Sequence, residues 1–221
     1  MGHTVTPDGH ILIHPKITML NVDCMEYMKT VPDKYFELAI VDPPYGIGGK
    51  DGNSRSTGSH GGRKAHELKG WDIRPGAFYF SQLFRISRNQ IIWGANYFTK
   101  YLPPSMGWIF WDKGQRIDNS DGELAFTSFE TAMRVAEYNR VELLIEGTIH
   151  PTQKPVKLYK WLLKNYAKEG DKIFDSHMGS GSIAIACHDY KFDLTACEID
   201  KDYFDAAKKR FDNHAAQLSF V

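Results

Sequence analysis

The most chemically specific stretch of the sequence is Asp42–Pro43–Pro44–Tyr45, which places a carboxylate, two prolines and an aromatic ring within four residues. The prolines fix φ at successive positions and supply no N–H donors, so the turn is stiff and its carbonyl oxygens can only accept hydrogen bonds. A planar group that carries an N–H₂ would find acceptors for its hydrogens and a stacking surface for its ring here. The four residues therefore predict a binding site for an aminated ring.

The segment before this turn positions the carboxylate. Glu37–Val41 has the length and apolar character of a strand buried on both faces, as in the centre of a parallel sheet. Asp42 then lies at the carboxyl end of the strand, which is the edge where open α/β sheets bind ligands. We therefore expect Asp42 to face a crevice.

Two motifs resemble those of a known family. Asp42–Pro43–Pro44–Tyr45 resembles the catalytic tetrapeptide of the S-adenosylmethionine (SAM)-dependent DNA amino-methyltransferases, which methylate adenine N6 or, less often with this first residue, cytosine N4. His150–Pro155 resembles the motif before the family's cofactor site, where the Lys-Pro step lies beside the methionine part of SAM. Pro155 would begin a helix, and unpaired N–H groups there would favour the ligand's carboxylate.

A second ligand-binding turn is predicted near the end of the chain. The predicted strand Lys172–Asp175 is followed by Ser176–Ser182 and then by the predicted helix Ile183–Tyr190. Gly179 and Gly181 carry no side chains, so a ligand could approach the backbone closely. A Gly-x-Gly turn alone is weak evidence for a ligand site.

The next strand strengthens this prediction. Leu194–Cys197 ends in Glu198, where a carboxylate is placed to accept both hydroxyls of a ribose. In the family, the turn usually reads Asp-Pro-Phe before the glycines, whereas this chain has Ser176–His177–Met178. The departure leaves the glycines and acids in place and removes the usual aromatic packing.

The resemblance runs from about Ile17 to Phe211, and the catalytic turn precedes the cofactor turn, as in the circularly permuted beta subgroup. It implies a catalytic role for Asp42, Pro43, Pro44 and Tyr45. For SAM binding it implies Asp23, Cys24, Asp42, Lys154, Pro155, Asp175, Gly179, Gly181, Ser182, Glu198 and Ile199. Asp23 also has the sequence position of a helix cap, and Ile199 would lie against the adenine ring of SAM.

Nucleic-acid contacts must come from local patches, because Lys plus Arg and Asp plus Glu are equal at 27 each. The Gly-rich loop of about 46–70 directly follows the catalytic turn, and we interpret it as a basic clamp on a phosphate backbone; the alternative is a solvated loop without a role. Trp93 and Tyr97 are candidate walls of the target-base pocket or, alternatively, aromatic core. The residues expected to contact nucleic acid are Lys50, Arg55, Arg63, Lys64, Lys69, Trp93 and Tyr97.

Three cysteines without paired spacing, Cys24, Cys187 and Cys197, predict buried free thiols in a reducing compartment. We expect no metal site, and we interpret His150 and His177 as structural. No apolar run approaches 18 residues, so we expect no membrane span and a cytoplasmic location.

Strands and helices alternate along the chain, which predicts an α/β fold: one doubly wound, mostly parallel sheet, with seven strands by resemblance to the Rossmann-like methyltransferases. Residues 1–221 would form a single domain without a large target-recognition domain. We expect Met1–Pro15 to be a loosely held arm, and the acidic segment Asp118–Glu146 to supply the remaining strands and a solvated face at the far edge of the sheet. The other elements expected are strands at Ile17–Asn21, Gln90–Trp93 and Gly107–Trp111, and helices at Cys24–Thr30, Pro75–Arg88 and Lys201–Leu218.

The resemblance implies transfer of a methyl group from SAM to adenine N6 in DNA, by direct displacement after the base is flipped out of the duplex. The alternatives are a cytosine-N4 or RNA amino-methyltransferase and a non-catalytic nucleic-acid-binding module that retains the cofactor pocket. DNA is the expected partner, together with a possible second copy of the chain, because the family often dimerises. The residues specify neither the DNA sequence that the protein recognises nor whether it has a nuclease partner in a restriction-modification system.

Overall fold

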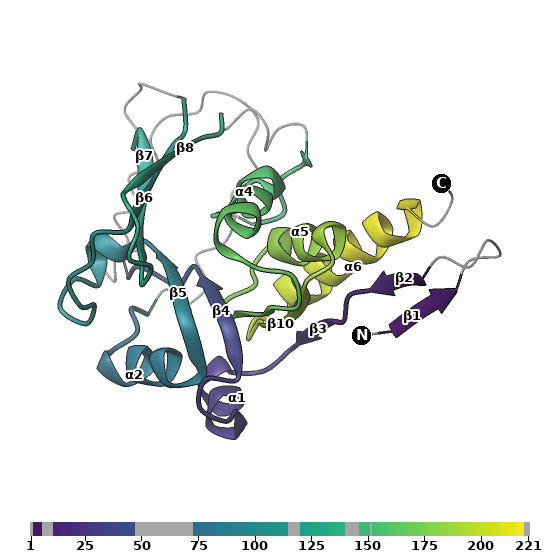
Figure 1. Cartoon of the computed structure of the whole chain (residues 1–221), viewed down its shortest axis with the longest axis horizontal. Helices are drawn as coiled ribbons and strands as arrows, with labels where there is room; N and C mark the ends of the chain where they lie inside the picture. The colour runs from purple at the N-terminus through teal and green to yellow at the C-terminus, as the bar shows by residue number, and fades with distance from the viewer. Residues whose placement is uncertain are drawn as a thin grey trace.

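The computed structural model describes residues 2–5, 11–46, 73–114, 120–139, 146–150 and 152–218. Its main sheet has eight strands in the order β3-β10-β9-β4-β5-β7-β6-β8 (Figure 1). The strands are β3 (Ile17–Leu20), β4 (Phe36–Val41), β5 (Ser87–Trp93), β6 (Trp108–Asp112), β7 (Gly122–Thr127), β8 (Arg134–Glu137), β9 (Lys172–Asp175) and β10 (Asp193–Cys197). The predicted Gly-rich loop and its basic residues Lys50, Arg55, Arg63, Lys64 and Lys69 lie outside the described residues.

The sheet is mostly parallel, as predicted. Five strands, in the sheet order β3-β10-β9-β4-β5, run parallel to their neighbours. Strand β7 is antiparallel to both β5 and β6, and β8 is parallel to β6. The prediction of seven strands is wrong, because β8 adds an edge strand beyond β6. Only Ala136 of β8 is buried, so the strand carries little of the apolar pattern from which a strand is predicted.

Helices cover both faces of the sheet. They are α1 (Cys24–Thr30), α2 (Ala77–Ile86), the 3-10 helix η1 (Ala95–Tyr97), α4 (Val156–Tyr166), α5 (Ser182–Tyr190) and α6 (Lys201–Leu218). Figure 1 shows α1 and α2 on one side of the central strands and α4, α5 and α6 on the other. The arrangement is the predicted doubly wound α/β fold.

Strand β4 is the central element that the sequence predicted. Its alternate residues enter two different cores: Leu38 and Ile40 pack with α4 and α5, whereas Ala39 and Val41 pack with α1 and α2. Burial on both faces explains the uninterrupted apolar run that precedes Asp42.

The first residues form a hairpin rather than the predicted loose arm. Strands β1 (Gly2–Val5) and β2 (Ile11–His14) pair antiparallel, from Gly2 opposite His14 to Val5 opposite Ile11. The polar residues and prolines of this segment suggested an arm, but antiparallel pairing satisfies the backbone without a long apolar pattern.

The five parallel strands end at one edge of the sheet, and a carboxylate stands at four of these ends. Asp42 follows β4, Asp175 ends β9, Glu198 follows β10, and Asp23 lies just beyond β3. Adjacent strands are about 4.8 Å apart, so the topology gathers residues that are far apart in the chain. Among the described helices, none has the length and apolar character needed to cross a bilayer.

Candidate active site

Both carboxylate oxygens of Asp42 are occupied by other side chains. Oδ1 accepts a hydrogen bond of 2.5 Å from the Tyr45 hydroxyl, and Oδ2 lies 2.5 Å from Nζ of Lys154. The Asp42 and Lys154 side chains are only 12% and 2% exposed. The structure thus joins the predicted catalytic turn to the predicted Lys-Pro step, 112 residues later in the chain.

Lys154 has a second carboxylate partner that the sequence analysis missed. Its ammonium group lies 2.9 Å from Oε2 of Glu123 in β7, and Oε1 of Glu123 lies 2.6 Å from Nζ of Lys113. Charges therefore alternate along Lys113, Glu123, Lys154 and Asp42. Glu123 belongs to the acidic segment that was predicted to be a solvated face, and that prediction is wrong for this residue.

The charges in this row shift one another's pKa values. Burial raises the pKa of Asp42, and the nearby Glu123 adds to this rise, while Lys154 opposes it. Burial also disfavours the Glu123 carboxylate, yet the ammonium groups of Lys154 and Lys113 lower its pKa to about 2. Lys154 is buried too, but its two carboxylate neighbours raise its pKa above the ordinary value. Glu123 has two cationic partners and stays ionised, so Asp42 is the carboxyl group whose pKa rises.

A cavity of about 550 Å³ lies beside this row, within the usual range for ligand pockets. Its walls include Tyr45, Asn96, Tyr97, Lys113, Glu123 and Lys154. The Tyr45 and Tyr97 rings stack with centroids 5.1 Å apart and an angle of 16° between their planes. The predicted position of Tyr97 at a pocket wall agrees with this cavity.

Gly94 allows Tyr45 to take this position. A Cβ on Gly94 would lie 2.1 Å from Cε1 of Tyr45, and Gly94 has φ of +64°, which side-chain-bearing residues rarely adopt. Nε of Arg74 donates a 2.9 Å hydrogen bond to the Tyr45 carbonyl, so the turn is held from both sides.

Trp93 does not line the cavity. It is fully buried at the end of β5, packs edge-on against Trp111, and lies beneath Lys154, with Nζ 5.2 Å from its ring centroid. The predicted contact of Trp93 with nucleic acid is therefore wrong for this structure, and its core alternative is correct. At a strand end, the residue type alone could not distinguish the two.

The glycine turn lies at the ends of β9 and β10. A Cβ on Gly179 would be in ordinary van der Waals contact with the His150 ring, at 3.6 Å, so it would not clash with its neighbours. Both glycines have a positive φ, +52° for Gly179 and +71° for Gly181, but only at Gly181 would a Cβ be crowded, at 3.2 Å from Cβ of Ala207 in α6. Gly181 is thus required by helix packing and backbone conformation, whatever ligand the turn binds.

Glu198 connects the end of β10 to this turn. Its Oε2 accepts the Gly179 N–H and its Oε1 accepts the Asp200 N–H, both at 2.9 Å. Burial raises the pKa of Glu198 above the ordinary value. The neighbouring Ile199 is 60% exposed and presents an apolar side chain at the same edge.

A polar network fills the place of the family's Pro-Phe step. The Ser176 hydroxyl lies 2.6 Å from the Tyr79 hydroxyl and 2.8 Å from Nδ1 of His177, whose ring meets Tyr79 edge-on. Burial lowers the pKa of His177 to about 4, so the imidazole is neutral at pH 7. Burial raises the pKa of Asp175 to about 8, although its Oδ1 accepts the His177 N–H.

The remaining predicted cofactor residues have mainly structural contacts. Asp23 caps α1 by accepting the Met25 N–H at 2.7 Å, as predicted, and is exposed. Cys24 faces the core, and burial raises its thiol pKa to about 12. The Ser182 hydroxyl accepts a hydrogen bond from Arg210. All three cysteines are free and buried, as predicted.

The start of α4 is not available to a ligand carboxylate in the way predicted. Pro155 does precede the helix, but the Val156 N–H donates to Oε1 of Glu146 at 3.0 Å. Glu146 also lies 3.0 Å from Nη2 of Arg210. A carboxylate of the chain itself thus occupies this helix terminus.

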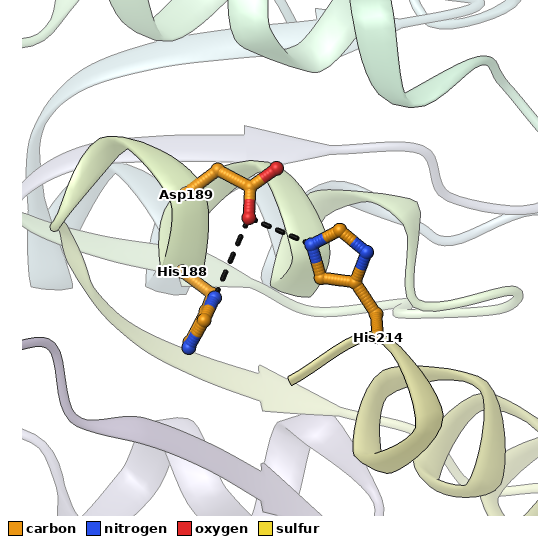
Figure 2. A group of neighbouring side chains, drawn as sticks. All are labelled: His188, Asp189 and His214. Carbon is orange, nitrogen blue, oxygen red and sulfur yellow. Dashed lines mark hydrogen bonds and ion pairs between the residues drawn. The ribbon is translucent and has the colours of Figure 1, made fainter. Parts of the chain in front are cut away.

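Three side chains elsewhere have the chemistry of metal ligands (Figure 2). Asp189 Oδ1 lies 2.7 Å from Nε2 of His214 and 3.4 Å from Nδ1 of His188, and Asp189 Oδ2 lies 2.7 Å from Nζ of Lys160. The adjoining cavity of about 720 Å³ is lined by Lys157, Lys160, Lys209 and Arg210, against the acidic Glu146 and Asp189. Because this excess of positive charge disfavours a cation, we interpret the cluster as a polar connection between α4, α5 and α6.

The comparisons with known proteins agree with the fold. A family model described as DNA methylase, for N6/N4 methyltransferases, matches residues 92–209, more than half of the chain. A crystal structure of an M1.HpyAVI–SAM complex has a TM-score of 0.58 at 19% identity and covers 88% of this chain and 99% of that one. The PvuII DNA methyltransferase, described as cytosine-N4-specific, has a TM-score of 0.60 at 12% identity and covers 90% of this chain and 89% of that one.

A curated relative matches over a shorter segment. Over 64 residues the chain is 36% identical to the type II methyltransferase M.HpaI of Haemophilus parainfluenzae. The matched segment covers 29% of this chain and 20% of M.HpaI. The chain thus spans about a fifth of the length of this relative. From the extent of the family match, together with the fold, we conclude that the chain belongs to the N6/N4 DNA methylase family.

Proposed function

We propose that the chain transfers a methyl group from SAM to the exocyclic amino group of a base in DNA, with adenine N6 as the target. The observation that carries this proposal is the position of Asp42, at the carboxyl end of β4, hydrogen-bonded to Tyr45 and beside a cavity of about 550 Å³. Residues 1–221 would act as one methyltransferase domain, and the loop of about 46–70 would contribute to DNA binding.

The residues at the sheet edge fit SAM as a cofactor. Gly179 carries no side chain at the turn, Glu198 and Asp23 provide carboxylate oxygens, and Ile199 offers an exposed apolar surface for a ring. Each Glu198 oxygen accepts one N–H, and a carboxylate oxygen has a second lone pair for a ribose hydroxyl. When bound, SAM supplies a methyl group on a positively charged sulfur.

The catalytic turn would hold the target base and its amino group. Tyr45 offers its ring for stacking with a flipped base, as aromatic side chains do in base-modifying enzymes. An aromatic amino group is a poor nucleophile, because its lone pair is delocalised into the ring. Asp42 and the Pro43 carbonyl would accept the two amino hydrogens and stabilise the positive charge that develops on nitrogen.

Cytosine N4 is the second candidate target. The family includes both activities, and the PvuII enzyme with the same fold is described as cytosine-N4-specific. Both target groups are aromatic amines with two hydrogens, so the same two acceptors would serve either base. The aspartate at position 42 is the sequence feature that favours adenine.

Asp42→Ala tests the proposal directly. We expect the variant to bind SAM normally by calorimetry and to lose about 10²- to 10⁴-fold in methyl transfer from radiolabelled SAM to DNA. Mass spectrometry of the nucleosides then identifies the methylated base. Near-normal turnover by Asp42→Ala would remove Asp42 from the chemistry, and SAM binding by the unaltered chain without methyl transfer to any DNA or RNA would favour the binding-module alternative.

A further inference from the structure

We propose that Glu123 is a positioning residue that receives the Lys154 ammonium group when the target amino group displaces it from Asp42. This inference rests on the proposed function, because it concerns how Asp42 becomes available to the substrate. Glu123 does not touch the reacting atoms in this account, and it acts through Lys154.

The need for such a residue follows from the contacts of Asp42. Its Oδ2 lies 2.5 Å from Lys154 and its Oδ1 accepts the Tyr45 hydroxyl, so an amino group that is to take the place of Lys154 at Oδ2 must displace a buried ammonium group. Lys154 cannot simply move away, since its side chain is 2% exposed and an unpaired buried ammonium group is strongly disfavoured. Release of Asp42 therefore requires a second anion within reach of Lys154.

Glu123 meets this requirement. Its Oε2 is buried and already lies 2.9 Å from Nζ of Lys154, so it is an anion within reach of the ammonium group. The ammonium group lies closer to Asp42, at 2.5 Å from its Oδ2. A small movement of Nζ would exchange one carboxylate for the other and keep the charge paired throughout.

The surroundings hold Glu123 still while Lys154 moves. Glu123 lies on β7 opposite Trp111, and Lys113 binds its other oxygen at 2.6 Å. Lys154 lies on the segment before α4, with its ammonium group over the Trp93 ring. A carboxylate fixed on a strand thus faces a lysine with a long flexible side chain.

The charge of Glu123 also acts on the titration of Asp42. The groups that act on Asp42 or feel its charge are Lys154 before α4, Glu123 on β7, Tyr45 in its own turn, Asp175 on β9, Tyr79 on α2 and Tyr159 on α4. Of these, Glu123 raises the pKa of Asp42 and Lys154 lowers it. Removing the Glu123 charge should therefore lower the pKa of Asp42 and leave Lys154 bound to it more firmly.

The test compares the unaltered chain with Glu123→Gln, Glu123→Asp and the control Glu26→Gln. Glu26 forms an ion pair with Lys29 in which both side chains are more than half exposed, so its substitution removes one glutamate charge at the surface. For each protein we would measure kcat and KM for DNA against pH, and titrate the Asp42 carboxyl carbon by NMR without ligands.

For Glu123→Gln we expect kcat to fall about tenfold or more, equivalent to about 1.4 kcal/mol of barrier, with KM for SAM and DNA unchanged. The acid limb of the kcat profile and the Asp42 titration should both move to lower pH. Glu123→Asp should restore both towards the values of the unaltered chain, and Glu26→Gln should change neither.

Two results would overturn the inference. The first is a Glu123→Gln variant whose kcat and Asp42 titration are both unchanged. The second is a Glu123→Gln variant that loses thermal stability while the acid limb of its kcat profile stays at the same pH, because this result marks a purely structural role. If Glu123→Gln does not fold, Glu123→Asp and the Asp42 titration of the unaltered chain decide instead. An unaltered chain that methylates no nucleic acid refutes the proposed function, and the ligand-free titration still reports whether Glu123 and Asp42 are coupled.

Discussion

The two turns at the carboxyl edge of the sheet are organised differently. At the catalytic turn, other side chains satisfy the functional group: Lys154 and Tyr45 each contact one oxygen of Asp42. At the glycine turn, backbone N–H groups satisfy Glu198. The comparison shows that backbone groups hold Glu198, whereas Asp42 is held by side chains that the proposed mechanism would displace.

The largest effect that separates the two turns should come from Gly94→Ala. The new Cβ would lie 2.1 Å from the Tyr45 ring, so the ring must move, and the backbone at φ of +64° would be strained. We expect DNA methylation to fall about 10²-fold, as for a small misplacement of a reacting group, with SAM affinity unchanged. Gly76→Ala is the matched control, because no atom lies within 4 Å of its Cβ. Equal methylation rates for the two variants would show that the Tyr45 position is not needed.

For Glu198→Gln we expect a smaller effect than for Gly94→Ala, and on SAM affinity instead of the methylation rate. The substitution weakens the acceptor that holds the Gly179 and Asp200 N–H groups and that we propose for the ribose. Hydrogen bonds to charged groups contribute about 1.5–3 kcal/mol, so SAM affinity measured by calorimetry should fall about tenfold or more. At saturating SAM, kcat should stay close to that of the unaltered chain. A fall in kcat with unchanged SAM affinity would contradict the division of roles between the turns.

The smallest effect, on the free energy of unfolding, is expected for Asp189→Asn, near the end of the helix α5 that follows the glycine turn. Partial burial disfavours the Asp189 carboxylate, but Lys160 and His214 lower its pKa below the ordinary value. Its stabilising contribution is therefore present above the ordinary pKa of about 4 and is lost as pH falls through the lowered value. We expect a loss of about 0.5–1 kcal/mol in unfolding free energy at pH 7, measured by urea denaturation, that shrinks in acid.

The control for this substitution is Asp212→Asn, which breaks an exposed ion pair with Lys208. It should change the unfolding free energy less than Asp189→Asn, because both partners are more than half exposed. Adding Zn²⁺ to the unaltered chain should leave its stability unchanged. A zinc-dependent rise in melting temperature that Asp189→Asn abolishes would show that the cluster is a metal site.

Local sequence patterns predicted most of the elements that carry the two turns. The bounds of α1, β9 and α6 agree with those expected, and β4 differs by one residue at its start. These segments have strong periodicity and clear boundaries: Asp23 caps α1, and the Asp42 turn ends β4. The first strands of the chain were missed because they lack a sustained apolar pattern, and the strands of the segment Asp118–Glu146 were expected there without exact bounds.

The site was predicted less completely than the fold. Asp42, Tyr45 and Lys154 were identified from short motifs, and the structure brings them into contact. Glu123 could not be identified, because a glutamate in an acidic segment has the pattern of a solvated face. Its role depends on the pairing of β7 with β6, which places it opposite Trp111 and between Lys113 and Lys154.

The sequence by itself determined the strand ends that carry carboxylates, the stiff Asp42 turn and the glycine-rich turn before α5, since these are local properties of residue type and spacing. The tertiary structure alone decided that Lys154 binds Asp42, that Glu123 is its second partner, and that Trp93 lies in the core. These contacts join separate segments, and strand order and burial determine which charges meet.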